Sequence, residues 1–135
     1  MLSLTNLVSN IGVVATDTTG VGTIRQRLAA AGYGNDKAIF GYGWSGSVSY
    51  SLTNLVSNTG VVATDTTGVG TARRSIGAAT YGADQAIFGY GYTTTYVSMT
   101  NKVSNTGVVA TDTTGVGTAR LNATGASYSL TQGKT

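Results

Sequence analysis

The side chains able to do chemistry in this chain are few. The chain of 135 residues has no histidine and no cysteine, and all five of its acidic residues are aspartate. Histidine and carboxylates are the usual general acids and bases, and metal sites draw on histidine, cysteine and carboxylates. No catalytic group, cofactor site or metal site can be assigned from such a set. We therefore predict that the chain is not an enzyme and needs no cofactor.

The charged residues that recur along the chain are aspartate and arginine. Three aspartates occupy the same position in similar blocks of sequence, and an arginine follows each aspartate by eight residues: Asp17 and Arg25, Asp65 and Arg73, Asp112 and Arg120. This spacing allows a ring of charge that holds an anion, or an ion pair that ties one unit to the next. We favour the structural ion pair, because buried pairs set geometry more than they stabilise.

Aromatic residues recur as well. Trp44 and Tyr92 follow the sequence AIFGYG in two places, and Tyr50 and Tyr96 lie a few residues downstream. Aromatic rings at equivalent loops of a repeat can stack on sugars, and repetition then adds avidity. The other interpretation is packing between neighbouring units, where large apolar faces are needed. We favour packing and keep glycan binding by these four residues as the alternative.

A tandem repeat must position all of these residues. Residues 3–23 read SLTNLVSNIGVVATDTTGVGT, and residues 51–71 and 98–118 repeat this block with few changes. Between the blocks, residues 25–43 and 73–91 match more loosely and both end in AIFGYG. The aspartates of successive blocks lie 48 and then 47 residues apart. A period of this length is typical of propeller blades.

Each unit is predicted to contain four strands. Residues 47–53 alternate between polar and apolar, which indicates a strand with one buried face. Residues 60–66 form a β-branched run, residues 86–88 are continuously apolar, and residues 75–81 are rich in small side chains. Turn-forming residues at 82–84 separate the last two segments. The predicted fold class is all-β, with four-stranded blades of about 47 residues.

The order of these segments resembles that of the kelch-like β-propellers. The resemblance rests on Thr71-Ala72-Arg73 at the start of a unit, on the small-residue strand that follows, and on AIFGYG with its closing glycines. The chain is also similar to propeller-like repeats of phage tail and virion proteins. The resemblance covers nearly the whole chain, and it implies a β-propeller with a virion-associated or extracellular location.

The repeat is out of phase with whole blades. Residues 1–23 are predicted to be a partial blade, 24–71 and 72–118 complete blades, and 119–135 a second partial blade. A closed propeller needs at least about four blades, so we expect homo-oligomerisation to complete the ring. A two-chain ring of six blades is favoured over a trimer, because closed dimers are the commonest oligomers. A trimmed or permuted piece of a longer propeller is the other explanation.

Charge and hydropathy bear on the remaining partners. Eight basic and five acidic residues give a formal charge of +3, and the basic residues are scattered, whereas nucleic-acid binders gather them on one face. No segment approaches the roughly 18 apolar residues of a membrane helix. We therefore predict a soluble chain that binds neither nucleic acid nor membrane. The expected function is a non-enzymatic structural or binding repeat that assembles with itself, and the alternative is a lectin-like propeller that binds glycans.

Overall fold

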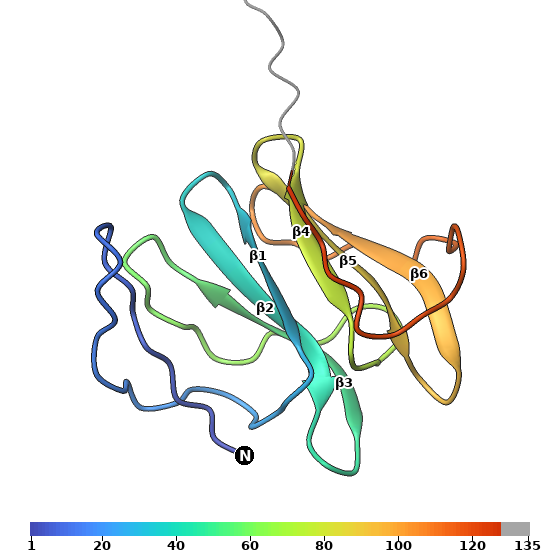
Figure 1. The fold of residues 1–135 in the computed structure, drawn as a ribbon, viewed down its shortest axis with the longest axis horizontal. Coiled ribbons are helices and arrows are strands. Elements are labelled where there is room, and N and C mark those ends of the chain that lie inside the picture. Colours follow the sequence, from blue (N-terminus) through green and yellow to red (C-terminus); the bar gives the residue numbers. More distant parts are fainter. Residues whose placement is uncertain (128–135) are drawn as a thin grey trace, which may run out of the picture.

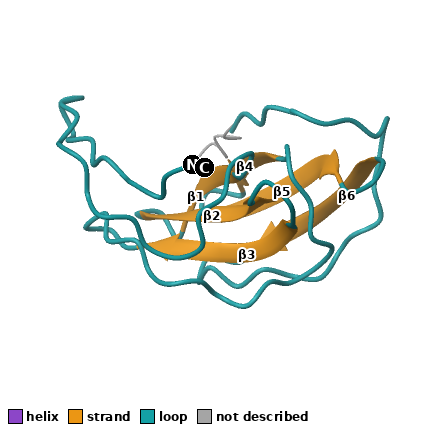
Figure 2. Ribbon diagram, turned by 90° about the horizontal axis from the view of Figure 1, so that it is seen from below, coloured by secondary structure: helices purple, strands orange, loops and turns teal. Residues whose placement is uncertain are grey.

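The computed structural model describes residues 1–127, and their regular structure is entirely β (Figure 1, Figure 2). The first sheet contains β1 (Ala29–Tyr33), β2 (Lys37–Trp44) and β3 (Ser49–Val56). The second sheet contains β4 (Gly77–Tyr81), β5 (Gln85–Tyr92) and β6 (Tyr96–Val103). Both sheets are antiparallel, with the strands side by side in chain order. The all-β prediction is confirmed, and no helix in this part of the chain is long and apolar enough to cross a membrane.

The two sheets repeat one pattern of strand pairing. Phe40 of β2 pairs with Ala30 of β1, and Phe88 of β5 pairs with Ala78 of β4. The turn between the first two strands contains two consecutive left-handed residues in both sheets, with φ of 58° and 69° in the first and 59° and 74° in the second. Such turns match the twist of the strands they join. The small-residue strand and the AIFGYG strand expected from the sequence are therefore present in both units.

A bulge in the middle strand of each sheet redirects one tyrosine. The pairing register shifts between the two glycines of the GYG sequence in both β2 and β5. Tyr42 and Tyr90 sit at these bulges with φ of 63° and 62°, in a left-handed region that bulky residues rarely adopt. A bulge can turn a side chain toward a new face of the sheet. In the first sheet it directs Tyr42 into the space between the two sheets, where the side chain is fully buried.

The core lies between the sheets, where β1 packs against β4 and β5. Its buried apolar residues come from both units: Tyr33, Ile39, Tyr42, Ile76, Ala86, Phe88 and Val103. The rings of Tyr42 and Phe88 meet edge to face, with their centroids 5.3 Å apart. The Phe88 ring also lies over Gly41, where a Cβ atom would come within 2.5 Å of Cζ. The glycine of the AIFGYG strand therefore makes room for the phenylalanine of the next unit.

The prediction of a fourth strand in each unit is wrong. Residues 60–66 meet β3 only at two isolated bridges, Val56 with Val62 and Thr53 with Thr66. These bridges are four residues apart on one segment and three apart on the other. The extra residue interrupts the ladder, as a bulge does. Residues 107–113 meet β6 in the same way, so each unit has three strands and a loosely paired edge segment.

The two predicted partial blades form no strands in the described residues. Residues 1–18 fold back on themselves through the bridges Thr5–Thr18 and Val8–Val14, again with the four-to-three spacing. This segment lies beyond the first sheet, on the side away from the second (Figure 1). Residues 119–127 run along β4 without strand pairing (Figure 1). The rest of the small-residue strand predicted there lies outside the described residues.

Candidate assembly interface

A buried arginine fastens the second sheet to the loop that precedes it. Arg73 lies in the loop before β4, and its side chain has no exposed surface. Its Nε donates a hydrogen bond to the carbonyl oxygen of Tyr90 at 2.9 Å, and Nη2 donates to Oδ1 of Asn101 at 2.7 Å. Nη1 donates to the carbonyl oxygen of Thr71 at 3.1 Å. The guanidinium thus connects its own loop to β5 and β6.

An aspartate on the edge segment completes this arrangement. The hydroxyl and the backbone N–H of Thr71 donate to Oδ2 of Asp112 at 2.6 and 3.0 Å. Nδ2 of Asn101 donates to Oδ1 of Asp112 at 2.9 Å, and Nη1 of Arg73 lies 3.9 Å from the same oxygen. We call Thr71, Arg73, Asn101 and Asp112 a latch, because together they close the loop onto the sheet and its edge segment.

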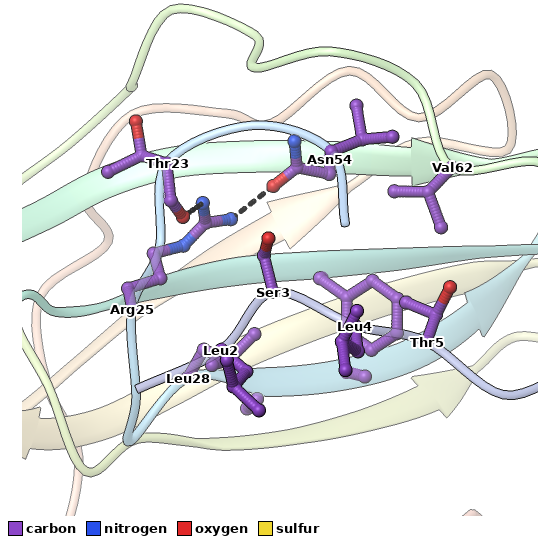
Figure 3. A pocket seen from close by; sticks show the side chains of 13 residues that line it. Leu2, Ser3, Leu4, Thr5, Thr23, Arg25, Leu28, Asn54 and Val62 are labelled. Carbon is purple, nitrogen blue, oxygen red and sulfur yellow. Dashed lines mark hydrogen bonds between the residues drawn. The ribbon is translucent and has the colours of Figure 1, made fainter. Parts of the chain in front are cut away.

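The first sheet holds an equivalent latch, made of Thr23, Arg25, Asn54 and Asp65. Figure 3 shows the guanidinium of Arg25 bonded to the carbonyl oxygen of Thr23 and to Asn54. The hydroxyl of Thr23 donates to Oδ2 of Asp65 at 2.6 Å, as in the second latch. No buried polar side-chain atom in the described residues lacks a partner.

The ion pairs differ from those suggested by the eight-residue spacing. Nη1 of Arg25 lies 3.5 Å from Asp65, which follows it in the chain, and Asp17 instead accepts a bond from Asn6. Arg73 likewise meets Asp112 in place of Asp65. The reason is topological, because the aspartate lies on the edge segment that returns alongside the third strand of the same unit. The pair therefore closes a unit on itself, and linkage to the next unit falls to other groups.

Sequence reasoning missed the threonine and the asparagine of each latch. Thr23, Thr71, Asn54 and Asn101 lie in the repeated block, two residues before the arginine or within the sequence LTN or MTN. Each recurs at a fixed spacing from the aspartate and the arginine, and this recurrence was the one feature of the sequence that pointed to them. Polar residues in a threonine-rich strand carry no mark of burial, so the spacing alone could not single them out.

The charges of the latch are tuned by burial and by hydrogen bonds. Partial burial opposes ionisation of Asp112, but the hydrogen bonds from Thr71 and Asn101 outweigh it and the pKa of Asp112 is lowered. The pKa of Asp65 is lowered in the same balance, with Thr23 and Asn54 as the donors. Both aspartates are therefore ionised at neutral pH, as acceptors of several N–H and O–H donors must be.

A tyrosine of the preceding sheet covers the latch arginine. Cζ of Arg73 lies 4.3 Å from the ring centroid of Tyr42, and the hydroxyl of Tyr42 donates to the carbonyl oxygen of Val69 at 3.1 Å. The N–H of Gly43 donates to the carbonyl oxygen of Arg73 at 3.1 Å. Burial raises the pKa of Tyr42, with Arg73 acting in the opposite direction. This contact joins one unit to the next.

Two halves of a latch remain, one near each end of the described chain. Nδ2 of Asn6 donates to Oδ1 of Asp17 at 2.8 Å, as Asn101 does to its aspartate. Nη1 of Arg120 donates to the carbonyl oxygen of Thr118 at 3.1 Å, and its Cζ lies 3.9 Å from the ring centroid of Tyr90. Arg120 is exposed. Within residues 1–127, neither half meets the other side chains that a whole latch contains.

Of the four aromatic residues considered for glycan binding, Trp44 and Tyr92 lie against arginine and Tyr96 lies against Tyr92. The guanidinium carbon of Arg74 lies 5.0 Å from the ring centroid of Trp44 and 4.7 Å from that of Tyr92. Tyr92 also meets Tyr96 edge to face, with centroids 5.8 Å apart, and Tyr50 is half-buried in β3. Because arginine occupies faces that a sugar would need, this arrangement favours packing between units.

Comparisons with protein-family models and with curated proteins give no match. The function must therefore be inferred from the geometry of the chain itself. The most informative geometry is the pair of half latches, since the whole latches show what each half is built to meet.

Proposed function

We propose that the chain is a non-enzymatic structural repeat module that assembles with copies of itself. The observation that supports this is the complementarity of the two half latches. Thr118 and Arg120 supply the donors that Thr71 and Arg73 supply in a whole latch, while Asn6 and Asp17 supply the acceptors. Residues 118–127 of one copy and residues 1–18 of another would thus contribute to one shared unit.

Charge and hydrogen bonding favour this union. A whole latch brings a guanidinium to an asparagine oxygen and a carboxylate to a threonine hydroxyl and N–H. Hydrogen bonds that involve a charged group contribute about 1.5–3 kcal/mol each when they are well formed. The exposed Arg120 and the Asp17 carboxylate carry opposite charges, so their approach is also favourable over a longer range.

Exposed apolar side chains near the first half latch point the same way. Leu2 is 75% exposed and Val8 is 63% exposed. Val103 occupies the place in the second sheet that Val8 occupies in its block, and it is fully buried. Contiguous exposed apolar surface on a soluble chain commonly marks an interface. Another copy of the repeat is the partner whose shape would reproduce the burial seen at Val103.

The proposed assembly is a closed β-propeller. Each unit within the chain packs on the next through the same tyrosine–arginine contact, and a relation repeated in this way forms a ring when the rotation between units closes. A two-chain ring of about six blades is the favoured form and a three-chain ring the alternative.

Light scattering coupled to size exclusion tests this function. We expect a species of about twice the 13.6 kDa chain mass, which dissociates on dilution. A mass of a single chain at every concentration would contradict the proposal. Added salt is expected to shift the equilibrium toward single chains, because part of the attraction is between exposed charges.

A further inference from the structure

A groove borders the first sheet on the side away from the second sheet. It encloses about 330 Å³ and its walls are mostly apolar, with Leu4, Leu28 and Phe40 among them. Arg25 and Asn54 of the first latch lie at one end (Figure 3). The loop of residues 2–5 forms the opposite wall. The groove therefore lies between the N-terminal segment and the sheet.

The equivalent face of the second sheet is covered by β1 and by Gly41 and Tyr42 of β2. There Phe88 is fully buried over Gly41, and Arg73 lies beneath the ring of Tyr42. In the groove Phe40 is only partly buried, and no aromatic ring covers Arg25 among the described residues. The groove thus has counterparts of the phenylalanine and the arginine that receive Gly41 and Tyr42 of β2, and no strand of the described residues lies on them.

The wall formed by the N-terminal segment offers backbone groups to such a strand. The N–H of Thr5 donates to Thr18, and the carbonyl of Leu7 accepts from Ala15, so odd-numbered residues bond toward residues 13–18. Backbone groups alternate in direction along extended chain, so those of Leu4 and Asn6 point the other way. They make no backbone hydrogen bond within residues 1–127. In the second sheet, this is the side on which β5 lies beside β6.

We propose that the groove binds an extended strand with the sequence AIFGYG from a further copy of the repeat unit, other than the segments of β2 and β5, which are already paired on both sides in their own sheets. The mode is strand addition, in which main-chain hydrogen bonds give affinity and side-chain pockets give specificity. The inference rests on the proposed function, because the partner is again this repeat. It goes beyond the proposed function because it names a second segment of the repeat as a binding partner. The half latches involve residues 118–120, whereas the groove binds the strand AIFGYG.

The pairing within the second sheet fixes the register of the donated strand. Gly89 pairs with Thr100 and Ile87 with Lys102 there, and the residues at these places in the N-terminal block are Thr5 and Leu7. In this register the first glycine of the donated GYG faces Phe40, and its tyrosine covers the guanidinium of Arg25. The donated phenylalanine points away from the first sheet, because side chains alternate along a strand.

A synthetic peptide with the sequence of residues 84–93, labelled with a fluorophore, tests the proposal by fluorescence anisotropy. The titrant is the full chain carrying Arg120→Ala, a change remote from the groove that keeps the half latches from joining. We expect saturable binding of one peptide per chain. A peptide with valine in place of the first glycine of GYG should bind at least about tenfold more weakly, because its side chain meets Phe40.

Two further peptides complete the test. Alanine in place of the GYG tyrosine should weaken binding about tenfold, through loss of the contact with Arg25. Threonine in place of the outward-facing phenylalanine is the matched control, and it should bind within about threefold of the parent peptide. Absence of saturable binding, or equal binding of the valine peptide, would overturn the proposal. Light scattering of the unmodified chain without peptide reports separately on self-assembly, so either proposal can fail alone.

Discussion

A buried guanidinium is tolerated in a protein only when its N–H groups find acceptors. In the latch, Arg73 finds two backbone carbonyls and the side chain of Asn101, while Asp112 holds that asparagine from its other side. Oδ1 of Asp112 lies 3.9 Å from Nη1 of Arg73, whereas Oδ1 of Asn101 lies 2.7 Å from Nη2. At this scale the aspartate therefore acts mainly by orienting the asparagine and the threonine.

Replacement of the buried arginine tests this network. Arg73→Ala removes the donors to the carbonyl oxygen of Tyr90 and to Oδ1 of Asn101, so we expect the free energy of unfolding to fall by about 2–4 kcal/mol. Urea denaturation measures the change. Arg120→Ala is the matched control, since the same residue type is exposed there, and under conditions where the chain is a single copy it should cost less than about 0.5 kcal/mol. Equal effects of the two changes would contradict the latch.

The middle strand is the element that relates one unit to the next. Its glycine makes room for the phenylalanine of the following sheet, and its bulge directs a tyrosine onto the following arginine. The sequence AIFGYG therefore encodes a contact between units as well as a strand. The same strand in the second sheet presents Gly89 and Tyr90 to residues 120–125.

A substitution at this glycine tests the contact between the sheets. Gly41→Val places methyl groups where the ring of Phe88 lies, and overpacking of this kind should cost about 1–3 kcal/mol. Gly89→Val is the matched control, because a Cβ atom there has Thr100 Cγ2 at 3.2 Å as its one close neighbour. Thermal unfolding followed by circular dichroism compares the two. The account of the interface is wrong if Gly41→Val is the milder change.

Local sequence signals predicted some elements and missed others. Turn residues at 82–84 and the apolar run at 86–88 predicted the hairpin of β4 and β5, because turn chemistry and strand pattern act over a few residues. The edge segment at 60–66 has equally strong β propensity and forms no strand, since an extra residue between its bridges interrupts the ladder. Pairing register of this kind depends on the partner segment, which propensity does not contain.

The candidate site shows the same division. The repeat marked the arginines and aspartates, but their pairing across about 40 residues depends on how the edge segment returns to its sheet. The half latches can be recognised only by comparison with the two whole latches in the structure. The repeat identified the aromatic residues Trp44 and Tyr92, but it did not predict that an arginine side chain covers them.

At the scale of the molecule, the two end regions differ in what they present. One end has acceptors at Asn6 and Asp17 with apolar side chains around them, and the other has donors at Thr118 and Arg120. A heterologous contact between such ends gives a ring if the rotation closes and a filament if it does not. The twist between successive units would decide between these outcomes, and a compact ring is the form we propose.

Mixing two complementary variants tests the central claim most directly. Asp17→Ala keeps the donor half of the latch and Arg120→Ala keeps the acceptor half, so neither variant can form a whole latch between its own copies. We expect light scattering to give the 13.6 kDa mass of one chain for each variant alone, and about twice that mass for the equimolar mixture, in which each pair of chains holds one whole latch and one contact without it. A mixture that stays at the mass of one chain, or variants that each keep the mass of the unmodified chain, would contradict the account.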